Sequence, residues 1–184
     1  TVDVGEKAIV CILGTGSNCT YYDGNGLDQK VTSLGYILMD EASGNFYGKQ
    51  LIRSYYFNEM SPELAKKFEE EFVLDADVIK ENIYRKENPN TYLATFSKFI
   101  IQHKDNPVFK EIIKKGIVRF VDHQILQFEN CREVPIHFIG SISFFLEDEL
   151  REVLETYGLK MGRIVRRPID RLVSFHKEML DSDF

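Results

Sequence analysis

The stretch IVCILGTGSNCTYYD, residues Ile9–Asp23, decides how this 184-residue chain folds. Its apolar run Val10–Leu13 is typical of a buried strand, and Cys19–Tyr22 begins a returning strand. Between them Gly14–Asn18 predicts a turn, because glycine reaches positive φ and lets another group approach the backbone closely. Such a turn can present backbone N–H groups and two hydroxyls to a phosphate. A glycine-rich hairpin that binds nothing is the simpler interpretation of the same residues.

Composition describes one globular domain and narrows the classes of partner. Hydrophobic residues make up 43% and charged residues 28%, which are ordinary values for a chain that buries a full core. A net charge of −6 with a pI near 5.3 argues against a nucleic-acid surface. No apolar run is long enough to span a bilayer, and no signal peptide is recognisable, so no membrane partner and a cytoplasmic location are expected.

The cysteine and histidine pattern indicates no metal or disulfide framework. Cys11, Cys19 and Cys131 form no C-x-x-C pair, which favours reduced and mostly buried thiols in a cytosolic protein. The four histidines are scattered without the spacing of metal ligands. We therefore expect no protein-held metal site in this chain.

Apolar spacing and turn residues divide the chain into a strand region, a helical insertion and a closing α/β unit. Together they predict an α/β fold of the ribonuclease-H-like class, with three antiparallel strands at the start, a helical insertion at about residues 60–130 and a closing β-α-β-α unit. The expected strands are 8–13, 18–23, 29–33, 134–139 and 160–166; the expected helices are 43–57, one beginning at 61, 76–84, one across 88–100, one beginning at 106, 142–157 and one beginning at Pro168.

A second block, LGYILMDEASG at residues 34–44, combines an apolar run with two acids before an expected helix. The Asp40 carboxylate could accept hydrogen bonds from ligand hydroxyls, or it could serve as an acid near a helix N-terminus, as could Glu41. Adjacent acids normally point in different directions, so only one of them is expected to face a cleft. Tyr36 either packs against a ligand or is buried in the core.

A third block, HFIGSIS at residues 137–143, reads as a strand that ends at Gly140 and leads into a helix, with Ser141 near the N-cap. A strand–glycine–helix junction lets a nucleotide base or ribose approach the backbone. A strand-to-helix connection that binds no ligand would have the same sequence pattern.

These three blocks, in this order and at this spacing, resemble the C-terminal lobe of the N-acetylglucosamine kinase and BadF-type ATPase family, within the actin–hexokinase–sugar kinase superfamily. The resemblance covers about residues 9–176 and implies an actin-type ATPase lobe that binds ATP with Mg²⁺. GTGSN resembles the second phosphate loop, LGYILMDEASG the sugar-contacting segment and IGS the start of the adenosine-side loop. The implied site residues are Gly14, Thr15, Gly16 and Ser17 for the nucleotide phosphates, Gly35, Tyr36 and Asp40 for the sugar, and Gly140 and Ser141 for the adenosine side.

Two features depart from the family pattern. Met39 and Ala42 stand where the family usually has glycine, which concerns the sugar segment rather than the phosphate loop. The resemblance also implies an N-terminal lobe with a DGGGT-like first phosphate loop and the aspartate general base, and no DGGGT-like stretch occurs here. We therefore expect the catalytic base in that missing lobe, and no turnover by this chain alone.

The resemblance favours half of an ATP-dependent kinase that phosphorylates N-acetylglucosamine or a related hexosamine. Its expected partners are the sugar, the nucleotide and the missing N-terminal lobe, with a homodimer left open. An ATPase activator of a 2-hydroxyacyl-CoA dehydratase or benzoyl-CoA reductase is one alternative, although no cysteine set for an iron–sulfur cluster is visible. A sugar- or nucleotide-sensing module without chemistry is another, and Met39 and Ala42 are the residues that favour it.

Overall fold

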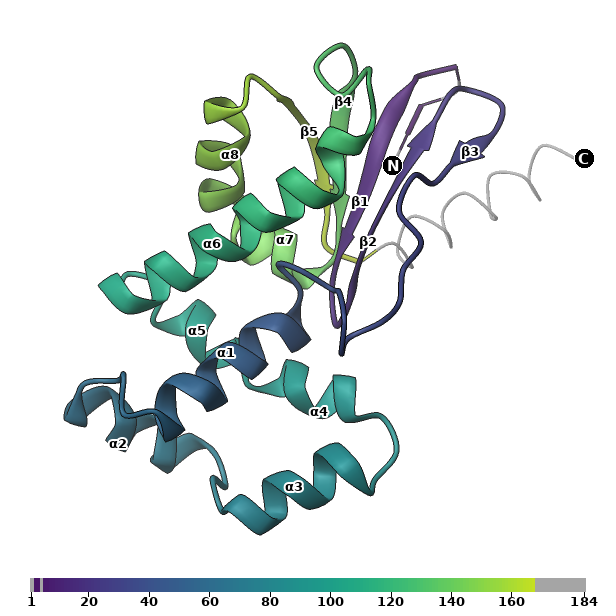
Figure 1. The fold of residues 1–184 in the computed structure, drawn as a ribbon. Helices are drawn as coiled ribbons and strands as arrows, with labels where there is room; N and C mark the ends of the chain where they lie inside the picture. The colour runs from purple at the N-terminus through teal and green to yellow at the C-terminus, as the bar shows by residue number, and fades with distance from the viewer. Residues whose placement is uncertain (1, 4, 168–184) are drawn as a thin grey trace, which may run out of the picture.

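The computed structural model describes residues 2–3 and 5–167, and the helix expected from Pro168 lies outside them. The chain forms a mixed five-stranded sheet in the order β3-β2-β1-β4-β5. In Figure 1 the helices α6 and α8 lie along the sheet, while α1 to α5 extend from the end of the sheet where β1 meets β2. This is the predicted α/β architecture.

The central strand β1 (Ala8–Leu13) connects the antiparallel and parallel halves of the sheet. It pairs antiparallel with β2 (Ser17–Tyr22) and parallel with β4 (Pro135–Ile139), which in turn pairs parallel with β5 (Lys160–Val165). Alternate side chains of β1 face the helical layer and are completely buried, whereas Ile12 on the opposite face is 46% exposed. The predicted strands at these positions are therefore confirmed.

The third strand was predicted at 29–33, and this is wrong: β3 is only Leu27–Asp28. The Asp23 carboxylate accepts hydrogen bonds from the N–H groups of Asn25 and Gly26, both at 2.8 Å. This Asx-type turn reverses the chain directly after β2, so the third strand pairs with β2 earlier in the sequence than the predicted range 29–33.

Helix starts follow their capping residues. Ser43 caps α1 (Gly44–Tyr56) and Ser61 caps α2 (Pro62–Glu71), each hydroxyl accepting a backbone N–H of the first turn. The predicted starts are confirmed here. The remaining helices of this group are α3 (Ala76–Tyr84) and α6 (Pro107–His123), the latter followed by the short 3₁₀ helix η1 (Ile125–Gln127).

Two helices that were predicted as continuous are divided. The helix expected across 88–100 is split at Phe96 into α4 (Pro89–Thr95) and α5 (Ser97–Gln102), and the one expected at 142–157 is split at Leu146 into α7 (Ser141–Phe145) and α8 (Glu147–Thr156). Phe96 and Leu146 are each only 1% exposed. At both positions one helix ends and the next begins at a large apolar side chain that is buried in the core.

The aromatic residues of the helical insertion form its core. The Phe68 ring lies 4.9 Å from that of Phe99 and 5.9 Å from that of Phe96, and Phe72 packs 4.8 Å from Phe96. Such offset and tilted pairs are the usual packing of buried rings. No helix in the described part of the chain is long and apolar enough to cross a membrane.

Candidate functional site

The turn between β1 and β2 is tight and anchored. Leu13 pairs with Ser17, which leaves Gly14, Thr15 and Gly16 as the turn, and the Gly14 N–H donates to the Gly16 carbonyl at 3.0 Å. Behind it lies the start of α1. The turn is therefore a fixed feature of the sheet edge.

Three hydrogen bonds from α1 orient the peptide planes of this turn. The Gly44 N–H donates to the Gly14 carbonyl at 2.7 Å, and Asn45 donates to the Thr15 carbonyl from its backbone N–H at 3.0 Å and from Nδ2 at 2.7 Å. In a trans peptide the N–H points opposite to the carbonyl. The N–H groups of Thr15 and Gly16 therefore point away from α1, and no hydrogen bond within the described residues uses either of them. Two parallel free donors on a glycine turn are the arrangement that binds anions.

Gly140 lies directly against this turn. Its φ is +128°, and a β-carbon built there would come 2.1 Å from the Leu13 carbonyl oxygen and 3.2 Å from the Gly14 nitrogen. Only glycine fits such an approach between the end of β4 and the end of β1. Ser141, the first residue of α7, is exposed beside it. The structure thus brings the expected adenosine-side residues next to the expected phosphate residues.

Asp40 also contacts the turn, from the other side. Its Oδ2 accepts a hydrogen bond from Asn45 Nδ2 at 2.8 Å, and a β-carbon on Gly16 would lie 2.7 Å from the same oxygen. Asp40 is 8% exposed and does not cap α1, because Ser43 does. The LGYILMDEASG segment and the β1–β2 turn, which the sequence treats as separate sites, therefore meet at one carboxylate.

The two expected hydroxyls differ in their surroundings. Thr15 is exposed at the tip of the turn, whereas Ser17 is 8% exposed and its Oγ has no hydrogen-bond partner among the described residues. Asn45 Oδ1 is likewise buried without a partner. Buried polar atoms are nearly always paired, so these two need a water or a ligand group. Asn45 was not predicted from the sequence. The available signal was its position directly after the LGYILMDEASG block, at the start of an expected helix.

The remaining sugar-segment residues form a turn that leads into α1. Gly35 has a φ of +79°, and its carbonyl accepts the N–H groups of Leu38 and Met39. Tyr36 is half-buried, and its carbonyl accepts a hydrogen bond from the Lys49 ammonium. These residues hold the backbone of the segment, and neither contacts the phosphate turn through a hydrogen bond.

Glu41 and Ala42 complete the segment. The Glu41 carboxylate points away from the turn and accepts a hydrogen bond from Arg119 at 2.8 Å. Adjacent acids thus face different sides, Asp40 toward the turn and Glu41 toward α6. Ala42 has a φ of +58°, a left-handed conformation that glycine adopts without strain. This is the physical reason for a glycine at that position in the family, and alanine adopts the same backbone here.

Within the described residues no group of three or more His, Cys, Asp or Glu side chains could hold a metal ion.

Neither a protein-family model nor a curated protein sequence matches the chain. Solved structures do. Over 94% of its length, with 37% identity and a TM-score of 0.87, the chain matches a Porphyromonas gingivalis protein provisionally described as an N-acetylglucosamine kinase. The resemblance to the N-acetylglucosamine kinase family is confirmed.

A Chromobacterium violaceum protein with the same provisional description matches 86% of the chain at 17% identity and a TM-score of 0.69, which shows the shared fold. The chain spans 60% of the length of the first of these proteins and 55% of the second. The fold is therefore that of the actin-like sugar kinases, as the sequence predicted.

Proposed function

We propose that this chain, residues 1–184 with its helical insertion at about 60–130, is the C-terminal lobe of an ATP-dependent kinase for N-acetylglucosamine or a related hexosamine. The observation that carries the proposal is the β1–β2 turn: the Gly14 and Thr15 carbonyls accept hydrogen bonds from α1, while the Thr15 and Gly16 N–H groups have no partner in the part of the chain that the structure describes. The similarity to the Porphyromonas gingivalis protein supports the same assignment.

Phosphoryl transfer depends on positioning and on stabilising charge around the transferred group. In this proposal the Thr15 and Gly16 N–H groups of the Gly14–Ser17 turn bind phosphate oxygens of ATP, together with the Thr15 and Ser17 hydroxyls. Gly140 and Ser141 border the adenosine, where the absence of a side chain at Gly140 keeps the backbone accessible. The Mg²⁺ that accompanies ATP neutralises phosphate charge, and it would be held mainly by the phosphates themselves, because the described residues offer no acidic cluster for it.

The sugar would bind at Asp40, beside the phosphates. A carboxylate that is already held by Asn45 is a well-oriented acceptor for sugar hydroxyls. The unpartnered Ser17 Oγ and Asn45 Oδ1 supply further polar atoms around the same contact. Gly35 and Tyr36 would shape the edge of this site through the turn that precedes Asp40. The general base is expected in an N-terminal lobe, so the chain by itself would hold substrates without turning them over.

The two alternatives make different demands on the structure. An activator of a 2-hydroxyacyl-CoA dehydratase or benzoyl-CoA reductase needs cysteines that can reach a cluster between subunits. Cys11, Cys19 and Cys131 are each at most 2% exposed, which disfavours that reading. A sensing module without catalytic activity is favoured by Met39 and Ala42, which stand where the family usually has glycine. Ala42, however, adopts the left-handed backbone conformation that a glycine would adopt at that position. The kinase is therefore the better-supported proposal.

A coupled assay of ADP release tests it on the whole protein that contains this chain and its second lobe. We expect ADP release that requires a hexosamine and is greater with N-acetylglucosamine than with glucose, and none from the 184-residue chain alone. Hydrolysis of ATP at the same rate without sugar, or sugar-dependent turnover by the chain alone, would refute the proposal. Measuring the iron content of the same preparation distinguishes the kinase from the dehydratase activator, which would hold an iron–sulfur cluster.

A further inference from the structure

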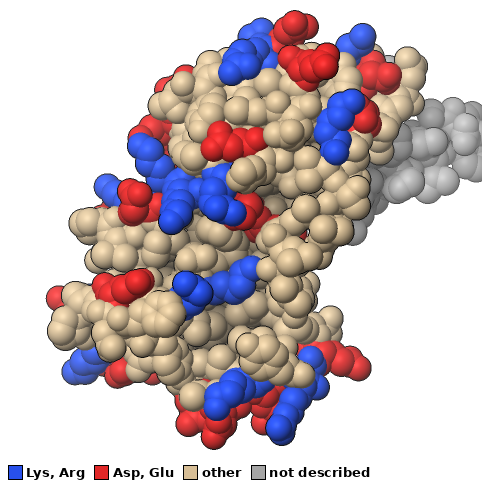
Figure 2. Space-filling model, in the orientation of Figure 1, with Lys and Arg blue, Asp and Glu red and all other residues tan. Residues whose placement is uncertain are grey.

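A cavity of about 790 Å³ lies between α1 and α6. The two helices are closely packed at its floor, because α6 approaches α1 at Gly116, where a β-carbon would come 2.8 Å from the Phe46 ring. Ile37, Leu38 and Met39 close one end. Figure 2 shows this hollow with basic side chains gathered on both of its sides.

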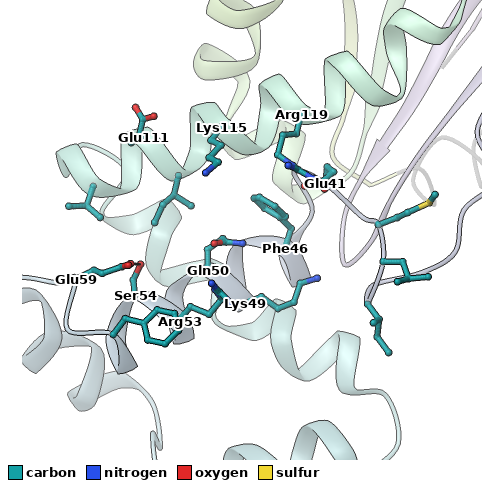
Figure 3. Close-up of a pocket in the computed structure, with 16 residues that line it drawn as sticks. Glu41, Phe46, Lys49, Gln50, Arg53, Ser54, Glu59, Glu111, Lys115 and Arg119 are labelled. Carbon is teal, nitrogen blue, oxygen red and sulfur yellow. Dashed lines mark hydrogen bonds and ion pairs between the residues drawn. The ribbon is translucent and has the colours of Figure 1, made fainter.

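Four basic side chains line this cavity in two matching pairs. Helix α1 contributes Lys49 and Arg53, and α6 contributes Lys115 and Arg119, so each helix carries a Lys-x-x-x-Arg pair one turn apart. In Figure 3 Lys115 points from α6 toward Gln50 and Arg53 on α1, while Arg119 lies beside Glu41. The Lys49 ammonium extends toward the segment before α1, where it donates to the Tyr36 carbonyl. The four cations therefore lie on the two helices that border one hollow, in a chain whose net charge is −6.

Acidic side chains neutralise this cluster only in part. Within the described residues Arg119 has an ion-pair partner, Glu41 at 2.8 Å, but no ion pair involves Lys49, Arg53 or Lys115. Like charges at i and i+4 destabilise a helix, and here both helices keep such a pair. An anion in the cavity would offset the like charges of Lys49 and Arg53 on α1 and the unpaired charge of Lys115 on α6.

The other carboxylates of the cavity do not fill this role. Glu59 accepts a hydrogen bond from Ser54 at 2.9 Å, and Glu111 is exposed. Figure 3 places both at the end of the cavity away from Glu41. Lys49 is half-buried, and its burial lowers the pKa of the ammonium group, which an adjacent anion would offset.

We propose that the cavity between α1 and α6 binds a small phosphate-bearing metabolite, with its phosphate groups between Lys49 and Arg53 on one side and Lys115 and Arg119 on the other. The exposed Ile37 and Leu38 side chains at the rim, at 73% and 70% exposure, would contact its carbon skeleton. This site goes beyond the proposed kinase function, and none of the residues of the β1–β2 turn lines it.

Titration of the isotope-labelled full chain with inorganic pyrophosphate, followed by amide chemical shifts, tests the proposal without any enzyme assay. We expect saturable shifts at residues 49–53 and 115–119. The double variant Arg53→Gln/Lys115→Gln should weaken that binding about 10-fold or more, since it removes two charge-assisted contacts. The matched control Lys110→Gln/Lys114→Gln removes the same charge from α6 outside the cavity lining and should leave the affinity within about twofold.

Three outcomes would overturn the proposal. Shifts confined to residues 14–17 would assign pyrophosphate to the phosphate turn alone and leave the kinase proposal intact. An equal loss in the control variant would show general attraction to positive charge. Shifts of the cavity amides that depend on protein concentration and not on pyrophosphate would identify the cavity as a contact between copies of the chain.

Discussion

The contact between Gly16 and Asp40 makes Gly16→Ala a sharp test of how the site is built. The new β-carbon would lie 2.7 Å from Asp40 Oδ2 and 3.2 Å from Cγ, both far inside normal contact distance. The carboxylate cannot simply swing away, because Asn45 Nδ2 holds the same oxygen at 2.8 Å. Overpacking of this kind typically destabilises by about 1–3 kcal/mol, and we expect a loss in that range.

A double-mutant cycle with Asp40→Ala isolates the contact. Removing the carboxylate should remove most of the penalty of Gly16→Ala, which gives a coupling free energy of about 0.5–3 kcal/mol in urea unfolding. Gly14→Ala is the matched control, since a β-carbon there meets nothing within 4 Å, and it should change stability by less than about 0.5 kcal/mol. Equal effects of the two glycine substitutions, or an undiminished effect of Gly16→Ala in the Asp40→Ala background, would refute the reasoning.

Three further experiments test the helix packing and two buried titratable sites. Gly48→Ala should destabilise by about 3 kcal/mol or more in urea, because its β-carbon would lie 1.8 Å from the Leu93 carbonyl oxygen; a mild effect would contradict the helix contact. Burial lowers the pKa of His137 below 6.5, so its contribution to stability is present above about pH 6.5 and is lost as the pH falls; His137→Gln should flatten that part of a stability–pH curve. Cys11 and Cys19 are at most 1% exposed, and burial raises the pKa of the Cys11 thiol, so a thiol reagent should label them only in denaturant.

Local chemistry could predict much of this fold. Glycines bracket the β1–β2 turn, Ser43 and Ser61 begin their helices as N-caps, and Gly158 follows the end of α8 with a φ of +66°. Each of these signals acts within a few residues of the chain. The interruptions at Phe96 and Leu146 could not be predicted, because only the surrounding core determines where a large side chain turns inward.

The candidate site shows the same division. The sequence could name Gly16 and Asp40 separately, but their contact depends on how the segment before α1 returns to the sheet edge. Asn45, which joins them, carries no motif of its own. The basic lining of the α1–α6 cavity could not be predicted either, because Lys49 and Lys115 are 66 residues apart in the chain and border one cavity only through helix packing.

The orientation of the turn between β1 and β2 is the central claim, and amide shifts of the chain titrated with a non-hydrolysable ATP analogue test it most directly. The account predicts saturable shifts of the Thr15 and Gly16 N–H resonances, because these two donors point away from α1 and have no partner among the described residues. The Gly44 and Asn45 N–H groups, already bonded to the turn, should stay hydrogen-bonded to it throughout. Thr15 and Gly16 resonances that do not move at saturation would contradict the account.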